Sequence, residues 1–255
     1  MFGFFALVSI VVLAGPTLVI LILSFTGEES LRFPPASYSL RWYAALADAN
    51  ELHAALWVSL KVAAMTVTAC VVMGVSASLA IARSHSRFAR LLETLFMSPL
   101  ILPALAFGFA TLMLFSMLGV RASALTLAIG HIVVCVPFVM RTTLASLAQL
   151  DPALLDASRS LGASGFHTFR HVTLPLISRG VASGAFIAFM ASFDNVPVSL
   201  FLQDARTQVL PIYLWDIIQN QLDGRAASAC GVIIIATALI MVLMERLAGF
   251  SRFVK

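Results

Sequence analysis

The chain has 255 residues, of which 60% are hydrophobic and only 11% are charged, and its mean hydropathy is +0.99. An average soluble domain is roughly 25% charged, so this composition excludes an ordinary soluble protein and predicts that lipid is the main solvent. The net charge of +4 comes from scattered basic residues without a long Lys or Arg run, which argues against nucleic acid as a partner.

Six apolar stretches approach or exceed the length of about 20 residues that a spanning helix requires. The first resembles a signal peptide in position, but it lacks a basic start and a small-residue cleavage site, so we interpret it as a retained span. The chain shows no boundary of a soluble domain, and we predict one all-α membrane domain over residues 1–255. The six predicted spans are Phe4–Phe25, Ala55–Ala82, Leu95–Leu118, Ala122–Met140, Val181–Leu202 and Ala227–Leu247.

The basic residues predict the orientation, because segments on the cytoplasmic side of a membrane carry an excess of Lys and Arg. With both termini in the cytoplasm, ten of the 16 basic residues lie inside and most acidic residues of the loops lie outside. The inner basic residues are Arg83, Arg87, Arg90, Arg141, Arg159, Arg170, Arg179, Arg246, Arg252 and Lys255.

All Trp and Tyr residues fall in or beside the segments assigned to the outer side: Tyr38, Trp42, Tyr43, Trp57, Tyr213 and Trp215. Amphipathic rings favour the membrane interface. This distribution is typical of an interfacial aromatic belt, and it also fits a docking face for an outer partner.

Cysteine and histidine residues in the predicted spans could have a chemical role. Cys70, Cys135 and Cys230 are far apart in apolar stretches, with no Cys pair or Cys/His cluster, so we predict small buried side chains and neither a disulfide nor a metal site. His131 in the fourth span fits either a proton relay or a hydrogen-bonded packing residue, and we favour the second.

The longest inner segment, residues 141–180, carries a helical pattern. Asp151 followed by Pro152 predicts a helix start, since Asp caps free N–H groups and Pro has none to lose. Gly162 predicts a left-handed end to that helix, and a second short helix is expected to place Phe166 and Phe169 on one side. Such a pair of helices is either a lid on the bundle or a lever that fits a groove of another protein.

The sequence Asp156-Ala157-Ser158, separated by three residues from Gly162 and followed by Leu174-Pro175 after the second helix, resembles the Glu-Ala-Ala loop. This loop marks the membrane subunits of binding-protein-dependent ABC importers. Asp and Ser replace Glu and the second Ala of the triplet, and both changes lower helix propensity slightly. The resemblance implies a type I importer permease fold with six spans, in which this loop couples to an ATPase. The implied coupling residues are Asp156, Ala157, Ser158, Leu161, Gly162, Phe166, Leu174 and Pro175.

Further segments resemble the spermidine/putrescine permease branch of that family. They are Phe33-Pro34-Pro35, Ser39–Tyr43, Ser59–Ala63, Ser192–Ser199 and Leu210–Tyr213. The resemblance implies import of a polyamine, and relatives in the branch that import opines, phosphonate compounds or ferric iron supply the alternatives.

Asp194 and Asn195 form the most polar stretch of the predicted spans. A charge at the centre of a spanning helix costs about 2.5–3.5 kcal/mol, so such residues usually face a cavity or a partner. Pro197 frees a backbone carbonyl nearby, and broken polar stretches of this kind line transporter pathways. We predict a substrate path at Ser192, Asp194 and Asn195; the alternative is a purely structural pair.

No phosphate-binding loop of the GxxxxGK[ST] type exists, since Lys61 and Lys255 are the only lysines. We therefore expect no cofactor on this chain and no enzyme activity of its own, with ATP bound by a partner subunit. The resemblance further implies a cytoplasmic ATPase dimer, a second similar permease and an extracytoplasmic solute-binding protein, at a bacterial inner membrane. An ion-coupled secondary transporter or a structural membrane subunit remain as rival classes, although one deep acid and no clear repeat disfavour the first.

Overall fold

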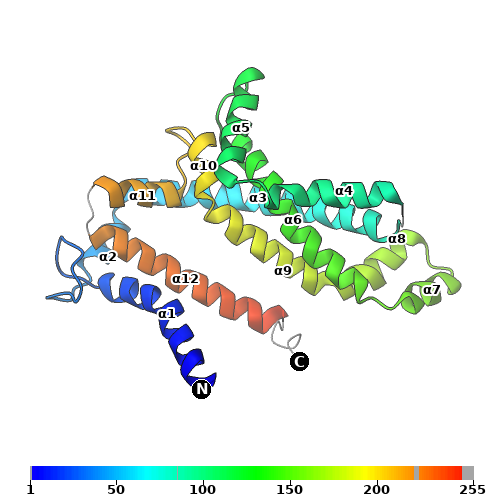
Figure 1. The fold of residues 1–255 in the computed structure, drawn as a ribbon, viewed down its shortest axis with the longest axis horizontal. Coiled ribbons are helices and arrows are strands. Elements are labelled where there is room, and N and C mark those ends of the chain that lie inside the picture. The colour runs from blue at the N-terminus through cyan, green and yellow to red at the C-terminus, as the bar shows by residue number, and fades with distance from the viewer. Residues whose placement is uncertain (1, 85, 221–223, 249–255) are drawn as a thin grey trace. The chain divides into compact units, whose positions relative to one another are not determined.

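The protein folds almost entirely into helices in a computed structural model that describes residues 2–84, 86–220 and 224–248 (Figure 1). No β-strand occurs among these residues, and an isolated antiparallel bridge joins Thr26 to Tyr38. The predicted all-α class is therefore confirmed. The α-helices are α1 (Phe2–Leu23), α2 (Arg41–Ala47), α3 (Asn50–Ala82), α4 (Arg87–Met97), α5 (Ala104–Met117), α6 (Ala124–Ala148), α7 (Pro152–Ser160), α8 (Gly165–Thr168), α9 (Leu174–Phe193), α10 (Val196–Leu202), α11 (Leu210–Asn220) and α12 (Gly224–Ala248). A 3₁₀ turn, η1, covers Ser98–Leu100, and a π-helical turn, η2, covers Phe169–Thr173.

Five helical stretches of the described chain are long and apolar enough to cross a membrane, and a bent pair makes a sixth if it counts as one span. The five are Gly3–Leu23, Asn50–Ala82, Ala124–Ala148, Gly165–Phe193 and Gly224–Val242. They correspond to the first, second, fourth, fifth and sixth predicted spans. Arg252 and Lys255, two of the basic residues assigned to the cytoplasmic side, lie outside the described residues.

The third predicted span, Leu95–Leu118, is wrong as a single straight helix. Helix α4 starts at Arg87, and the chain bends by 103° between the stretches Arg87–Leu100 and Ala104–Met117. Pro99 and Pro103 bracket the bend, and neither has the N–H that would continue a helical ladder. With 14 residues, α5 alone extends about 21 Å, which is less than the roughly 30 Å of a bilayer core.

The helices that flank the predicted inner segment 141–180 differ in their bounds from the predicted spans. Helix α6 continues past the predicted end at Met140 to Ala148, and the fifth span starts at Gly165 and ends at Phe193 instead of covering Val181–Leu202. Arg141 does not end α6, because Arg has a high helix propensity. Residues 149–164 therefore separate these two helical stretches.

The chain divides into two compact units, one of Met1–Leu56 with Ile212–Lys255 and one of Trp57–Pro211. In the first unit, α1 and α2 both pack against α12. The Tyr43 hydroxyl donates to Ser24 Oγ at 2.7 Å, and Ser228 Oγ donates to the Ser24 carbonyl at 2.8 Å. These bonds fix the end of α1 to α2 and α12.

Trp42 belongs to the packing of this unit, contrary to the prediction that all Trp and Tyr residues form a belt or docking face. Its side chain is buried, and Nε1 donates to the Glu28 carbonyl at 3.0 Å. The Arg41 guanidinium lies 4.4 Å from the centre of its ring. Tyr38, Trp57 and Trp215 are exposed, as either interpretation of the aromatic residues requires.

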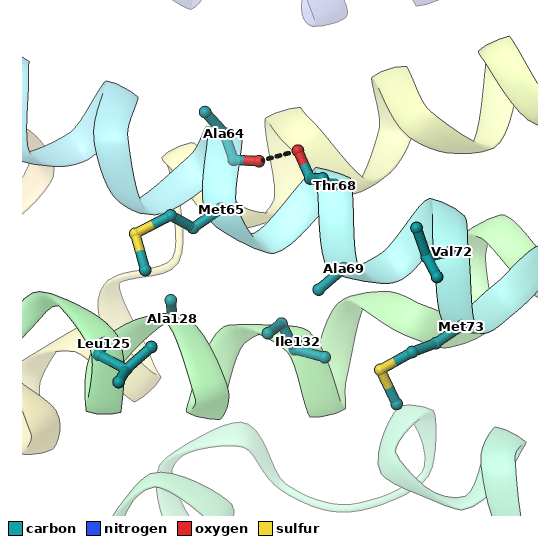
Figure 2. A pocket seen from close by; sticks show the side chains of 9 residues that line it. All are labelled: Ala64, Met65, Thr68, Ala69, Val72, Met73, Leu125, Ala128 and Ile132. Atoms are coloured by element: carbon teal, nitrogen blue, oxygen red, sulfur yellow. Dashed lines mark hydrogen bonds between the residues drawn. The ribbon is translucent and has the colours of Figure 1, made fainter.

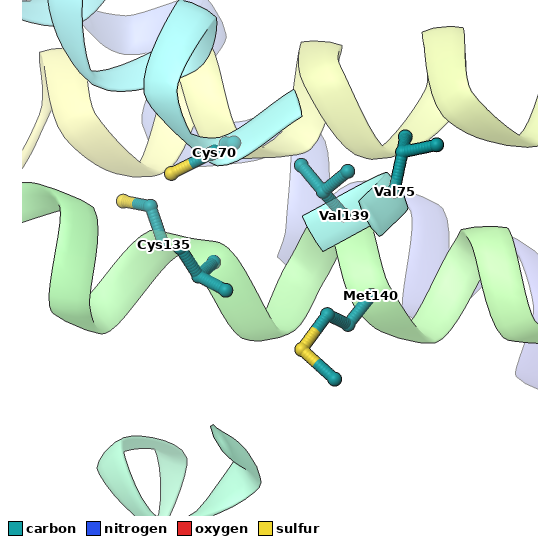
Figure 3. Packing of buried hydrophobic residues seen from close by; sticks show 7 residues of the cluster. Cys70, Val75, Cys135, Val139 and Met140 are labelled. Carbon is teal, nitrogen blue, oxygen red and sulfur yellow. The ribbon is translucent and has the colours of Figure 1, made fainter. Parts of the chain in front are cut away.

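The core of the second unit lies where α3, α6 and α9 meet. Cys70 and Val75 of α3, Cys135, Val136, Val139 and Met140 of α6, and Ala188 of α9 form its buried cluster (Figure 3). The predicted burial of Cys70 and Cys135 is confirmed, and both thiols are free. Small residues bring the helices this close, which is the usual packing device between spanning helices.

An open hollow of ≈ 700 Å³ follows the surface between α3 and α6 in the same unit (Figure 2). Its lining is almost wholly apolar and includes Ala64, Ala69, Met65 and Ile132. The Thr68 hydroxyl donates to the Ala64 carbonyl of its own helix at 2.8 Å. The hollow therefore suits an apolar neighbour.

Candidate functional site

Helix α7 occupies the centre of the predicted coupling segment, and local signals explain both its ends. Asp151 Oδ1 accepts a hydrogen bond from Ala153 N at 2.9 Å, and Pro152 stands in the first turn, where a missing N–H costs nothing. At the other end Gly162 has φ +80°. Gly162 N donates to the Arg159 carbonyl and Ala163 N to the Ser158 carbonyl, which is the Schellman arrangement. The predicted helix start and left-handed turn are both confirmed.

Ser158 connects α7 to α8. Its hydroxyl and that of Thr168 lie 2.9 Å apart and share a hydrogen bond. Ser158 stands where the Glu-Ala-Ala pattern has Ala, and sequence reasoning treated it as a loss of helix propensity only. The structure gives it a partner, so this departure from the pattern adds a cross-link between the two helices.

A widened turn joins α8 to α9 without a break. Leu174 N donates to the Phe169 carbonyl, five residues earlier, in the π-helical turn η2. Pro175 explains the widening, because its ring has no N–H and would clash with the carbonyl of His171 in a regular α-helix. The helix that starts at Gly165 therefore runs continuously to Phe193.

Two large apolar side chains of this segment are strongly exposed. Leu161 is 89% exposed and Phe166 is 71% exposed. Beside Leu161, residues including Gly162, Ser164 and Val172 line an open hollow of ≈ 530 Å³. Of the other predicted coupling residues, Asp156, Ala157, Leu174 and Pro175 are exposed, and Ser158 is half-buried. An exposed apolar projection of this kind can enter a groove of a partner protein.

We expect Gly162→Ala to strain the end of α7 by about 1 kcal/mol, because a Cβ disfavours positive φ. No atom lies within 4 Å of that Cβ, so the cost is conformational and not steric. If α7 transmits force, reconstituted complexes should consume more ATP per solute imported. Gly165→Ala is the matched control, since its position is equally open and its φ is not positive. Wild-type coupling in Gly162→Ala would count against a role for this turn.

The predicted substrate residues lie at the break between α9 and α10, and hydrogen bonds within the protein engage two of them. Asn195 Oδ1 accepts from Val198 N at 3.1 Å and so caps α10. Ser192 is buried and bonded to His131, with Oγ 2.9 Å from Nδ1. Asp194 is exposed, and its carboxylate makes no hydrogen bond or ion pair within the described residues.

His131 links three helices at this break, and sequence reasoning missed the residues that it joins. Its second nitrogen, Nε2, lies 3.0 Å from Ser199 Oγ of α10. The side chain is fully buried, with both ring nitrogens in hydrogen-bonding contact. The hydrogen bonds that a packing role of His131 requires are thus present, and they join it to a serine on either side of the break.

The loop after α10 is held by its own polar groups. The Thr207 hydroxyl donates to Asp204 Oδ1 at 2.7 Å, and Arg206 N donates to the same oxygen at 3.0 Å. The bond from Thr207 lowers the pKa of the Asp204 carboxyl. Leu210 N donates to the buried Ser59 Oγ of α3 at 2.8 Å, which ties the loop to the second span. In the part of the chain that the structure describes, no three His, Cys, Asp or Glu residues form a group that could hold a metal ion.

Comparison with known proteins connects these features to a family. Residues 70–251 match the family described as binding-protein-dependent transport system inner membrane component. The chain is 27% identical over 230 residues to the spermidine/putrescine transport system permease protein PotC of Escherichia coli (strain K12), covering 90% of this chain and 87% of the relative. It is 28% identical to the putrescine permease protein PotI of the same strain, covering 81% and 76%. The molybdenum permease protein ModB of Mycobacterium bovis is 32% identical, covering 78% and 80%.

Solved structures show the same fold at low sequence identity. A bacterial ABC transporter that imports the acidic polysaccharide alginate matches with a TM-score of 0.74 and 15% identity, covering 95% of this chain and 92% of that one. The MetNI methionine ABC transporter in an inward-facing form matches with a TM-score of 0.65 and 16% identity, covering 77% and 94%. These likenesses confirm the predicted type I importer permease fold.

Proposed function

Because the chain belongs to the family of inner membrane components of binding-protein-dependent transport systems, we propose that it forms half of an ATP-driven import pathway for a polyamine. Its proposed partners are two cytoplasmic ATPase subunits, a second similar permease and an extracytoplasmic binding protein. The proposed location is a bacterial inner membrane, with both termini in the cytoplasm. The names of PotC and PotI support the choice of solute class.

One observation carries the mechanism: a continuous helix joins the coupling segment to the polar break. Ser158 ties α7 to α8, and the helix from Gly165 to Phe193 ends next to Asp194. A displacement of α7 by a closing ATPase would therefore move the far end of α9, where His131 and Asn195 hold α10 in place. In this proposal, ATP hydrolysis takes place on the partner and changes access at the break.

The exposed carboxylate of Asp194 favours a cationic solute over an anionic one. Similarity to known transporters alone does not identify the solute. The names of PotC, PotI and ModB and the description of the alginate importer give different solutes. A negative charge in the path would repel an acidic polysaccharide and attract an ammonium group. The alternative solutes of the branch remain outcomes of the experiment below.

ATP hydrolysis by reconstituted complexes tests this function. The isolated chain should hydrolyse no ATP, and the complex with its ATPase and second permease should be stimulated by a binding protein loaded with spermidine or putrescine. Hydrolysis of ATP by the isolated chain would contradict the proposal that the partner subunit carries out this reaction. Stimulation by a binding protein loaded with an opine, a phosphonate or ferric iron, but not with a polyamine, would contradict the solute.

We expect Asp194→Asn to lower polyamine uptake roughly ten-fold or more, because a hydrogen bond to a charged group contributes about 1.5–3 kcal/mol. Assembly with the partners should be unchanged, since the carboxylate is exposed. Asp48→Asn removes an equally exposed acid outside the spans and should leave uptake unaffected. Uptake kinetics of Asp194→Asn equal to wild type would remove Asp194 from the path.

A further inference from the structure

Helix α4 has an apolar face that nothing within its own unit covers. Phe88, Leu91 and Leu95, at spacings of three and four residues, are 66%, 63% and 63% exposed. Another side of the helix is packed: Ala89 is buried, and Phe96 and Met97 contact the core cluster of α3, α6 and α9. The packed side fixes α4 on the protein and leaves the other apolar side facing outward.

Three arginines lie beside this face. Arg83 follows the last residue of α3, and Arg87 and Arg90 lie in the first turns of α4; all three are exposed. Within the described residues, none of their guanidinium groups makes a hydrogen bond or an ion pair, and Glu93 is the one acid of α4.

The position of the arginines opposes the electrostatics of their own helix. A helix N-terminus carries a partial positive charge, which basic residues in the first turn make less favourable. Helix α4 has no acidic residue in its first turn, and Ser86 Oγ, which accepts from Ala89 N at 3.1 Å, is its cap. A negative charge supplied from outside the chain would offset this repulsion.

The segment also follows the end of a candidate membrane span. Helix α3 qualifies as a span up to Ala82, so Arg83 and the start of α4 follow directly at its end. In Figure 1, α4 turns back from the end of α3, and α5 then leaves at a steep angle. A helix with arginines next to a Phe and Leu face is the pattern of an interfacial helix, whose apolar side enters the acyl chains while its basic residues meet the headgroups.

We propose that Arg83, Arg87 and Arg90 bind the headgroups of anionic phospholipids while Phe88, Leu91 and Leu95 contact their acyl chains. Under the orientation proposed above, this is the cytoplasmic leaflet. The surface is distinct from the coupling segment and from the break at Asp194. It would make the placement of the third span dependent on lipid charge, independently of the solute transported.

Lipid quenching measures this contact on the full chain. Leu91→Cys, in a chain with its native cysteines replaced, carries an environment-sensitive fluorophore and is reconstituted with brominated phosphatidylglycerol or brominated phosphatidylcholine. We expect both lipids to quench the label and phosphatidylglycerol to bind preferentially. Removing Arg87 and Arg90 as Arg→Gln should reduce this preference by roughly five-fold for each arginine. Arg121→Gln, an exposed arginine elsewhere in the unit, is the matched control and should leave the preference unchanged.

Three outcomes would overturn the proposal. A label at residue 91 that brominated lipid does not quench would place this face outside the membrane. An equal preference for the two lipids in the chain with all arginines would remove the role of charge. Shielding of the label from an aqueous quencher only after the ATPase is added would assign the face to a protein partner. Because transport is not measured, the solute proposal can fail without affecting this result.

Discussion

We expect Gly184→Leu to destabilise the protein by roughly 1–3 kcal/mol or more, because α6 leaves no room for a side chain at this position. A Cβ on Gly184 would lie 2.7 Å from the Cα of Val139 and closer still to the Thr142 hydroxyl. One turn earlier, a Cβ on Gly180 would lie 2.8 Å from the Thr142 carbonyl. Backbone atoms cannot turn aside as a flexible side chain can, so α6 and α9 would have to separate.

The measurement is thermal unfolding of the purified chain in detergent, followed by helix content and by size-exclusion profile. Gly15→Ala is the matched control, since it also lies within a candidate span and no atom would contact its Cβ. That change should be neutral or slightly stabilising, because Ala favours a helix over Gly by about 1 kcal/mol. If Gly184→Leu unfolds at the wild-type temperature, the close approach of α6 and α9 is incorrect.

Features set by a few neighbouring residues were predictable from the sequence. The start of α7 depends on Asp151 and Pro152, and its end depends on Gly162. These residues are neighbours in the sequence, so both ends of the helix can be predicted without knowing the tertiary structure. The five unbroken spans follow in the same way from hydropathy, which needs no knowledge of neighbours.

The bends were not predictable, because proline has more than one structural outcome. Pro137 stays inside α6, Pro175 is accommodated by a π-helical turn, and Pro99 with Pro103 accompanies a bend of 103°. Pro137 and the pair Pro99 and Pro103 both stand in apolar stretches, so hydropathy does not distinguish these two outcomes. What decides is whether neighbouring helices satisfy the freed carbonyls and leave space for the ring, and that depends on the packed structure.

The break at the predicted substrate residues was predictable from the sequence, whereas the hydrogen-bond partners of these residues were not. The sequence indicated a polar break near Asp194, and the structure has a break there. The sequence alone could not indicate that Asn195 caps α10 or that Ser192 bonds to His131, 61 residues away. A polar side chain near a membrane break can serve the backbone or a solute, and only the hydrogen-bond partners separate these roles.

His131→Leu is expected to cost roughly 2–4 kcal/mol of stability and to release α10 from α6. The substitution would leave Ser192 Oγ and Ser199 Oγ buried without the partner on which both depend. A buried unsatisfied hydroxyl costs about 1–3 kcal/mol, and hydrogen bonds between spanning helices contribute about 0.6–2 kcal/mol each. Unfolding temperature reports the loss, with His53→Leu at an exposed histidine as the control.

A second variant separates the packing role of His131 from a proton relay. Gln can donate and accept hydrogen bonds but cannot exchange a proton near neutral pH. If His131 positions α10, His131→Gln should recover much of the stability and of the uptake that His131→Leu loses, because one amide can still reach a serine on either side of the break. If His131→Gln is stable but inactive, the histidine carries a proton and the hydrogen bonds to Ser192 and Ser199 are its route. Recovery of uptake in the Gln variant would instead support the proposal that ATP hydrolysis on the partner is the single reaction that drives transport.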